Sequence, residues 1–111
     1  MIEQRDLLLV PFPFSVQSGQ KVRPVVVISK NAFNQFSDDV ITVAITSNTS
    51  KGPYNVLLSP DDVEEGNLRH MCCIKVESIL KIDKKLIVKK IGKIKLSLFQ
   101  ETIKILFSIM R

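Results

Sequence analysis

The chain has 111 residues and a mass of 12.5 kDa, with 45% hydrophobic and 24% charged residues, so we expect one folded domain spanning residues 1–111 and no disordered chain. No apolar run approaches the ~18 residues of a membrane helix, and the first ten residues lack the pattern of a signal peptide. These observations predict a cytoplasmic protein without a membrane partner. The adjacent Cys72 and Cys73 and the single His70 exclude a disulfide framework and a four-ligand zinc site, so we expect reduced thiols, no metal and no cofactor.

The charge balance is basic. There are 16 Lys and Arg residues against 11 Asp and Glu, a net charge of +5, and most of the surplus lies after residue 55. A basic half is typical of a protein that binds a polyanion, but a solvated lysine-rich face gives the same composition. The charge alone therefore leaves both interpretations open.

Three strands are predicted in the first half of the chain. Leu7–Val10 is a short apolar run, and Pro24–Ser29 and Val40–Thr46 are rich in β-branched residues. The two prolines of Pro11–Phe14 exclude regular structure there, and the polar stretch 15–22 predicts a loop. The connection 31–39 has room for a short helix. In the third strand, one face carries Ile41, Val43 and Ile45, and the other carries Thr42, Ala44 and Thr46.

The second half predicts shorter strands and a closing helix. We expect a turn over 47–53, strands over 55–58, 71–76 and 86–91, a turn or single helical turn over 59–62, and Gly92 just after the last strand. Ser97 and Gln100 form a capping-box pattern that starts a C-terminal helix. That helix carries two apolar stripes: Phe99, Ile103, Leu106 and Met110 form one, and Leu98, Ile105 and Ile109 form the other.

Five to six strands followed by one helix predict a mainly β fold, a strongly bent sheet or small partly open barrel with a C-terminal helix. The two stripes exceed the ~100° arc that an ordinary surface helix buries. One stripe can pack on the sheet, and we expect the other, Ile105 and Ile109, to face a second copy in a homodimer, unless a loop of the same chain covers it.

Two sequence blocks are distinctive. Asp6–Ser15 followed by Gly19–Ser29 contains Pro-Phe-Pro-Phe and then Arg23-Pro24, and the second block, Asp39–Ser47, is a strand that ends in Ile-Thr-Ser. Their composition and spacing resemble the MazF/PemK toxins of type II toxin–antitoxin systems. A third block, Leu68–Lys75, fits more loosely, and the resemblance covers nearly the whole chain.

This resemblance implies an SH3-like barrel of the CcdB/MazF type, a homodimer, and a metal-independent, sequence-specific endoribonuclease that cleaves single-stranded RNA, chiefly mRNA. It also implies a cognate antitoxin as partner. The catalytic pair of the family falls on Arg23 and Thr46. A guanidinium offers forked donors that match phosphate oxygens, and a threonine hydroxyl adds a small donor, so both residue types suit attack by the RNA's own 2′-OH.

Further residues are expected to bind RNA. Phenylalanines can stack on bases, although they can equally fill the barrel, and lysines can hold phosphates. The candidates are Phe12, Phe14, Gln20, Lys21, Ser47, His70 and Lys75. The RNA sequence that is cut and the proton donor and acceptor are not predicted.

The chain departs from the family pattern at two positions. Arg5 stands where glycine is common, and Cys72 stands where a serine is usual. A thiol donates hydrogen bonds poorly, so the change at Cys72 leaves open a non-catalytic RNA-binding module. A toxin that poisons gyrase, as CcdB does on the same barrel, is the other alternative.

Overall fold

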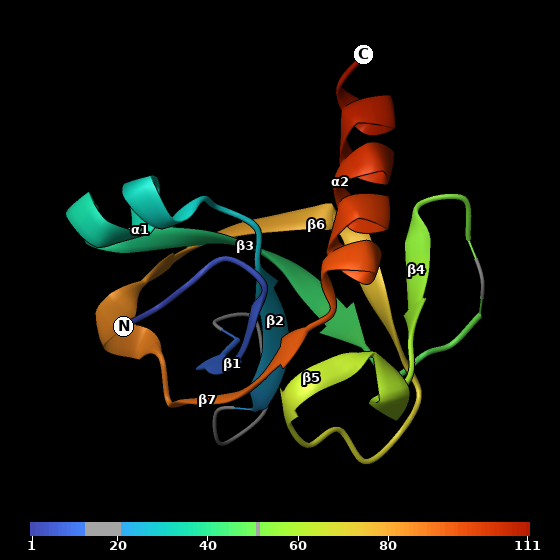
Figure 1. Cartoon of the computed structure of the whole chain (residues 1–111), viewed down its shortest axis with the longest axis horizontal. Helices are drawn as coiled ribbons and strands as arrows, with labels where there is room; N and C mark the ends of the chain where they lie inside the picture. The colour runs from blue at the N-terminus through green and yellow to red at the C-terminus, as the bar shows by residue number, and fades with distance from the viewer. Residues whose placement is uncertain (13–20, 51) are drawn as a thin grey trace.

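A computed structural model describes residues 1–12, 21–50 and 52–111. Within these residues seven strands are followed by a long helix at the C-terminus (Figure 1). The elements in chain order are β1 (Asp6–Pro11), β2 (Val22–Val27), α1 (Asn31–Phe36), β3 (Asp39–Thr46), β4 (Asn55–Leu58), the 3-10 turn η1 (Pro60–Asp62), β5 (Val63–Gly66), β6 (Cys72–Asp83), the 3-10 turn η2 (Lys84–Leu86), β7 (Lys89–Ile94) and α2 (Leu96–Met110).

The strands form one sheet in the order β4-β6-β3-β2-β1-β7-β5, and every pair in it is antiparallel. The sheet curls into a half-barrel, with α2 rising from it beside β6 (Figure 1). The prediction of a mainly β, strongly bent fold with a C-terminal helix is confirmed.

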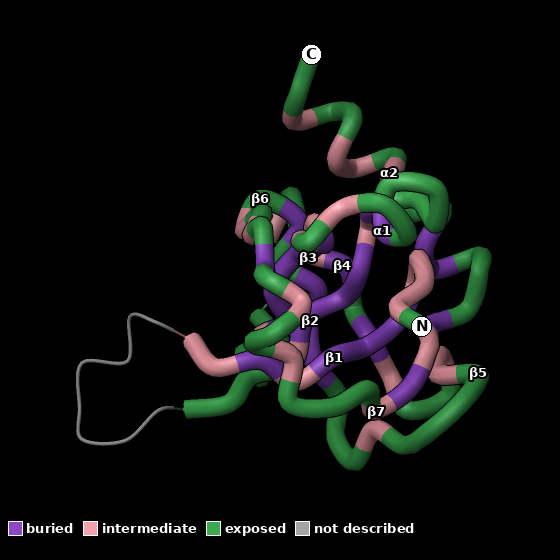
Figure 2. Tube along the Cα trace, turned by 90° about the vertical axis from the view of Figure 1, so that its left-hand side faces the viewer, coloured by how far each residue is buried: buried purple, intermediate pink, exposed green. Residues whose placement is uncertain are grey.

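Both faces of the sheet are apolar in its middle, and each face has its own core cluster. The larger cluster contains Val26, Val43 and Ile45 and lies under the start of α2. The smaller cluster contains Val25 and Val27 and lies on the opposite face. The predicted alternation along β3 is therefore correct, and the middle of the sheet is buried on both sides (Figure 2).

Three strands of the structure differ from the prediction. Strand β5 was not predicted, because its sequence VEEG lacks an apolar alternation. Strand β6 continues to Asp83, seven residues beyond its predicted end at Val76. The last strand begins at Lys89, and Gly92 lies inside it, opposite Gly66 of β5. A Cβ atom on Gly92 would lie 2.4 Å from the carbonyl oxygen of Glu65, so the close approach of these two strands requires glycine there.

A large bulge in β6 explains why the sequence pattern did not predict its full length. Val43 and Ala44 are neighbours in β3, but their partners in β6 are Ile79 and Lys75. Three residues, 76–78, therefore lie between the two pairings, and β6 bends at this point (Figure 1). A bulge of this kind interrupts the alternation on which the sequence prediction depended.

Helix α2 begins earlier than predicted. Its N-cap is Lys95 and no side chain caps it, so the predicted capping box at Ser97 is wrong; a capping box is found instead at Ser59 and Asp62 of η1. Only Leu98, Phe99 and Thr102 are buried in the helix. Its C-terminal half extends away from the sheet, where the surface is exposed or half-buried (Figure 2).

The two apolar stripes of α2 do not separate as predicted. Each begins with one buried residue, Phe99 or Leu98, and then continues half-buried along the larger cluster through Ile103 and Leu106 or Ile105 and Ile109. The large apolar side chains that α2 leaves exposed are Leu96, Phe107 and Met110.

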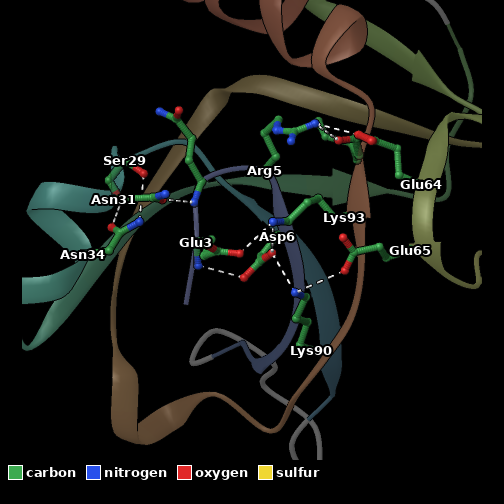
Figure 3. Close-up of polar contacts among 12 residues, drawn as sticks. Glu3, Arg5, Asp6, Ser29, Asn31, Asn34, Glu64, Glu65, Lys90 and Lys93 are labelled. Atoms are coloured by element: carbon green, nitrogen blue, oxygen red, sulfur yellow. Dashed lines mark hydrogen bonds and ion pairs between the residues drawn. The ribbon is translucent and has the colours of Figure 1, made fainter. Parts of the chain in front are cut away.

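A network of charges fixes the N-terminus to β7 (Figure 3). The carboxylate of Asp6 is fully buried and lies 3.1 Å from Lys90 Nζ and 3.8 Å from Lys93 Nζ, and its other oxygen accepts the backbone N–H of Glu3. Lys93 also donates to Glu3 at 2.8 Å, which raises the pKa of Lys93 and lowers the pKa of Glu3. These contacts give Asp6 a structural role.

Candidate functional site

Arg23 lies near the start of β2, opposite Val10 of β1, and its side chain is exposed. Its guanidinium carbon stands 5.6 Å from the centre of the Phe12 ring, a cation–π distance. Phe12 in turn packs against the smaller core cluster. The ring therefore supports the guanidinium from one side while leaving its N–H donors at the surface.

Thr46 is the last residue of β3 and is half-buried. Its Oγ1 accepts a hydrogen bond of 3.2 Å from the backbone N–H of Asn48 in the turn that follows. An oxygen that accepts this bond keeps its own O–H free to donate. The turn thus orients the Thr46 hydroxyl as a donor.

The register of the sheet places Arg23 and Thr46 near the same end of two neighbouring strands. β2 and β3 pair with Val25 opposite Ala44. Continuing this antiparallel register by two residues puts Arg23 opposite Thr46, and residues opposite each other in a ladder project from the same face. Both side chains therefore belong to the face that carries the smaller cluster. The two residues singled out by motif, 23 positions apart in the chain, therefore lie just beyond the last pairing of β2 with β3 and on the same face of the sheet.

Strand β6 adds residues on the same face. Cys73 is the direct partner of Thr46, and Lys75 is the partner of Ala44. Lys75 is exposed, and the only carboxylate paired with it among the described residues is that of Glu77, at 4.0 Å. Cys72 points the other way into the larger cluster, where burial raises the pKa of its thiol. Cys73, which the sequence analysis did not single out, is thus the cysteine beside Thr46.

The remaining candidates lie at the rim of this face or outside the described residues. Ser47 follows Thr46 and is exposed. Lys21 is exposed, and its carbonyl accepts the N–H of Phe12, which extends the β1–β2 pairing. His70 lies in an exposed bend before β6, and its carbonyl accepts a hydrogen bond from the Cys72 thiol. Phe14 and Gln20 lie outside the described residues.

Metal ligands do not gather in the described part of the chain: no group of three or more His, Cys, Asp or Glu residues is placed to hold an ion there. Both cysteines are free thiols. No helix among the described residues is long and apolar enough to cross a membrane. A hollow of about 280 Å³, lined by Asp38, Asp83, Lys84 and Lys85, lies where β3 begins, at the other end of that strand from Thr46.

A family model described as "PemK-like, MazF-like toxin of type II toxin-antitoxin system" matches residues 3–109. The chain belongs to this family. No curated protein sequence matches it. Several solved structures share its fold at low sequence identity.

An endoribonuclease from a mycobacterial species, solved in complex with its cognate antitoxin, has a TM-score of 0.81 at 16% identity, over 99% of this chain and 95% of that one. A MazE–MazF complex from Deinococcus radiodurans has a TM-score of 0.80 at 17% identity, over 98% and 95%. The Mycobacterium tuberculosis toxin MazF-mt6 has a TM-score of 0.77 at 14% identity, over 96% of each chain. The half-barrel and its helix are therefore the fold of the MazF structures.

Proposed function

We propose that this MazF/PemK-family chain is a sequence-specific, metal-independent endoribonuclease that cleaves single-stranded RNA, in particular mRNA, as the growth-inhibiting toxin of a type II toxin–antitoxin pair. Membership of the toxin family supports this function, as does the description of a structural neighbour as an endoribonuclease. The observation that carries the proposal is the register of β2 with β3, which would set Arg23 opposite Thr46 on one face of the sheet if continued by two residues.

The reaction needs no nucleophile from the protein. The 2′-oxygen of a ribose attacks the adjacent phosphorus, the bond from phosphorus to the 5′-oxygen breaks, and the products are a 2′,3′-cyclic phosphate and a 5′-hydroxyl. The enzyme must hold the oxygen in line and stabilise the charge that develops on the phosphoryl oxygens. Arg23 supplies forked donors for those oxygens, and Thr46 supplies a hydroxyl oriented by Asn48.

Arg23 acts by its charge. A guanidinium is not deprotonated in proteins, so it stabilises the transition state and does not accept the proton of the 2′-OH. The Phe12 ring beneath it limits the positions that the long side chain can take. Lys21, Ser47, His70 and Lys75 are the exposed candidates for contacts with phosphates or bases. Phe14 and Gln20 are further candidates from the sequence.

Two protein partners belong to this function. A cognate antitoxin would neutralise the toxin, and the solved complexes of structural neighbours with their antitoxins support such a partner. A second copy of the chain would bind through α2, whose C-terminal half exposes Phe107 and Met110. A homodimer of this kind buries apolar side chains that the monomer leaves in water.

The test is incubation of the purified chain with a long transcript of mixed sequence in millimolar EDTA, with mapping of the fragment ends. We expect a few discrete cut sites. Arg23→Lys should lose about 10²-fold or more in rate, because a point charge cannot replace a bidentate fork. Thr46→Val should also be impaired, while Arg111→Lys at the C-terminus, a matched exposed arginine, should cleave normally.

Other outcomes would replace the proposal. RNA that is bound but stays intact would indicate a non-catalytic RNA-binding module, and neither binding nor cleavage would favour a toxin that acts on a protein. Full activity of Arg23→Ala, with an unchanged circular dichroism spectrum, would remove Arg23 from the site. Activity that is lost in EDTA and restored by Mg²⁺ would require a metal mechanism.

A further inference from the structure

Leu57 is an apolar side chain in an unusual position. Its neighbours in β4, Val56 and Leu58, are buried in the larger cluster, whereas Leu57 is 48% exposed on the opposite face of the sheet. A single exposed leucine needs no explanation by itself. The position of Leu57 in the strand pairing, however, indicates a function for this exposed side chain.

Leu57 and Thr46 share a cross-strand partner. Leu57 pairs with Cys73, and Cys73 pairs with Thr46, so the three residues form a row across β4, β6 and β3 on one face. Cys73 is 1% exposed and forms the floor of this row. Strands lie about 4.8 Å apart, so Leu57 lies roughly 10 Å from the Thr46 hydroxyl. An exposed apolar surface therefore lies close enough to the proposed site of cleavage for a neighbouring nucleotide of the RNA to contact it.

The next row of the ladder adds a positive charge. Lys75 pairs with both Ala44 and Asn55, so it lies beside the row of Leu57 on the same face. Its contact with Glu77 is long at 4.0 Å, and both side chains are more than 40% exposed, so this ion pair holds Lys75 only weakly. Lys75 can thus turn to a phosphate at little cost.

We propose that Leu57 and Lys75 form a nucleotide-binding subsite beside Arg23 and Thr46, in which one base of the RNA packs on Leu57 while Lys75 contacts its phosphate. The subsite rests on the proposed ribonuclease function and extends it by naming a residue that selects the base. RNA is the occupant that the charges favour, because an apolar surface flanked by a lysine matches a base and its phosphate.

The test compares the fragment ends produced from one mixed-sequence transcript by the wild-type chain and three variants. Leu57→Ser removes the apolar surface, Leu57→Phe keeps it, and Leu86→Ser is a matched control at an exposed leucine in η2. We expect Leu57→Ser to relax the base preference at one position next to the cut and to raise KM about tenfold, with kcat little changed. Leu57→Phe should retain the preference, and the control should match the wild type.

The outcomes separate this inference from the proposed function. If the wild-type chain cleaves RNA and Leu57→Ser gives the same cut sites and KM, the subsite is wrong and the ribonuclease stands. If the wild-type chain cleaves no RNA, the ribonuclease proposal fails first. If Leu57→Ser keeps its RNA preference but becomes monomeric in sedimentation, Leu57 contacts a second copy and the subsite is overturned. If only capture of the antitoxin weakens, the surface binds that protein and not a base.

Discussion

Arg5 occupies the left-handed backbone region, with φ of 80°, while its guanidinium donates to Glu64 Oε1 at 2.7 Å and to the carbonyl of Ile94 at 3.0 Å. The backbone of the turn before β1 requires this conformation, which glycine adopts without cost. Arginine at this position is strained, but its side chain reaches across to β5 and β7 (Figure 3). The contacts of the arginine side chain, which glycine cannot make, thereby offset the backbone strain at this position.

Substitutions at Arg5 can separate these two effects. Arg5→Ala keeps the strain and loses the contacts, whereas Arg5→Gly loses both, so we expect the alanine variant to be less stable than the glycine variant by about 1–2 kcal/mol. Urea unfolding followed by circular dichroism measures the difference. An alanine variant as stable as the glycine variant would show that the backbone at this position is not strained.

Glu3 and Lys93 make stability depend on pH at both extremes. Because the pKa of Glu3 is lowered in the folded state, its contribution is present above the unfolded pKa of about 4.3 and is lost as pH falls through the folded pKa. Because the pKa of Lys93 is raised, its contribution is present below about 10.4 and is lost as pH rises through the folded pKa. Between these two pH limits the contribution of the pair to the free energy of unfolding should not change with pH.

The check is the free energy of unfolding against pH for Glu3→Gln and for Glu101→Gln, an exposed glutamate of α2. Glu3→Gln should be less stable than the wild type at neutral pH, and the difference should shrink below pH 4. Glu101→Gln should follow the wild-type curve. If both variants behave alike, the pair of Glu3 and Lys93 does not contribute.

Asp6 should be the most costly charge to remove. Its carboxylate is fully buried between Lys90 and Lys93, so Asp6→Asn leaves two ammonium groups without their buried counter-charge. Breaking a buried ion pair costs about 3–5 kcal/mol, and Lys90 is partly exposed, so we expect a loss of about 2–4 kcal/mol. Asp61→Asn, at an exposed position of η1, is the control and should be nearly neutral in thermal unfolding. A loss below ~1 kcal/mol in Asp6→Asn would contradict this role.

The local sequence pattern predicted the strands in which apolar residues alternate regularly or form a buried run. It failed for strands that are defined only by their hydrogen-bonded pairing with a neighbour. The β-branched runs of β2 and β3 and the short β4 were correct, because alternation or a buried run determines them. The pairing of β5 with β7 depends on Gly66 and Gly92, which let the two strands approach closely. The bulge after Lys75 interrupts the alternation that would otherwise have predicted the rest of β6. Neither feature leaves a periodic signal in the sequence.

The residues of the candidate site were also predictable only in part. Motifs indicated Arg23 and Thr46, and the register of β2 with β3 puts both residues on one face of the sheet. The motif placed the departure from the family pattern at Cys72, but the cysteine paired with Thr46 is Cys73, because position in a motif does not tell which face a side chain occupies. Leu57 was missed because its only signal is exposure in an otherwise buried strand. Register and burial are properties of the folded sheet, so these residues could be found only there.

The C-terminal helix carries the remaining prediction, that of the dimer. Phe107 and Met110 are 63% and 61% exposed on a part of α2 that extends beyond the sheet, whereas Ile105 and Ile109 pack partly against the larger cluster. We therefore expect Phe107→Asp with Met110→Asp to give a folded monomer, because each buried apolar side chain contributes ~1.5–3 kcal/mol to association. Ile105→Asp with Ile109→Asp should also lower the thermal stability of the fold. Sedimentation at tens of micromolar measures the oligomeric state, with Lys104→Asp, an exposed position of the same helix, as the control. A wild-type chain that is monomeric at this concentration would exclude the dimer.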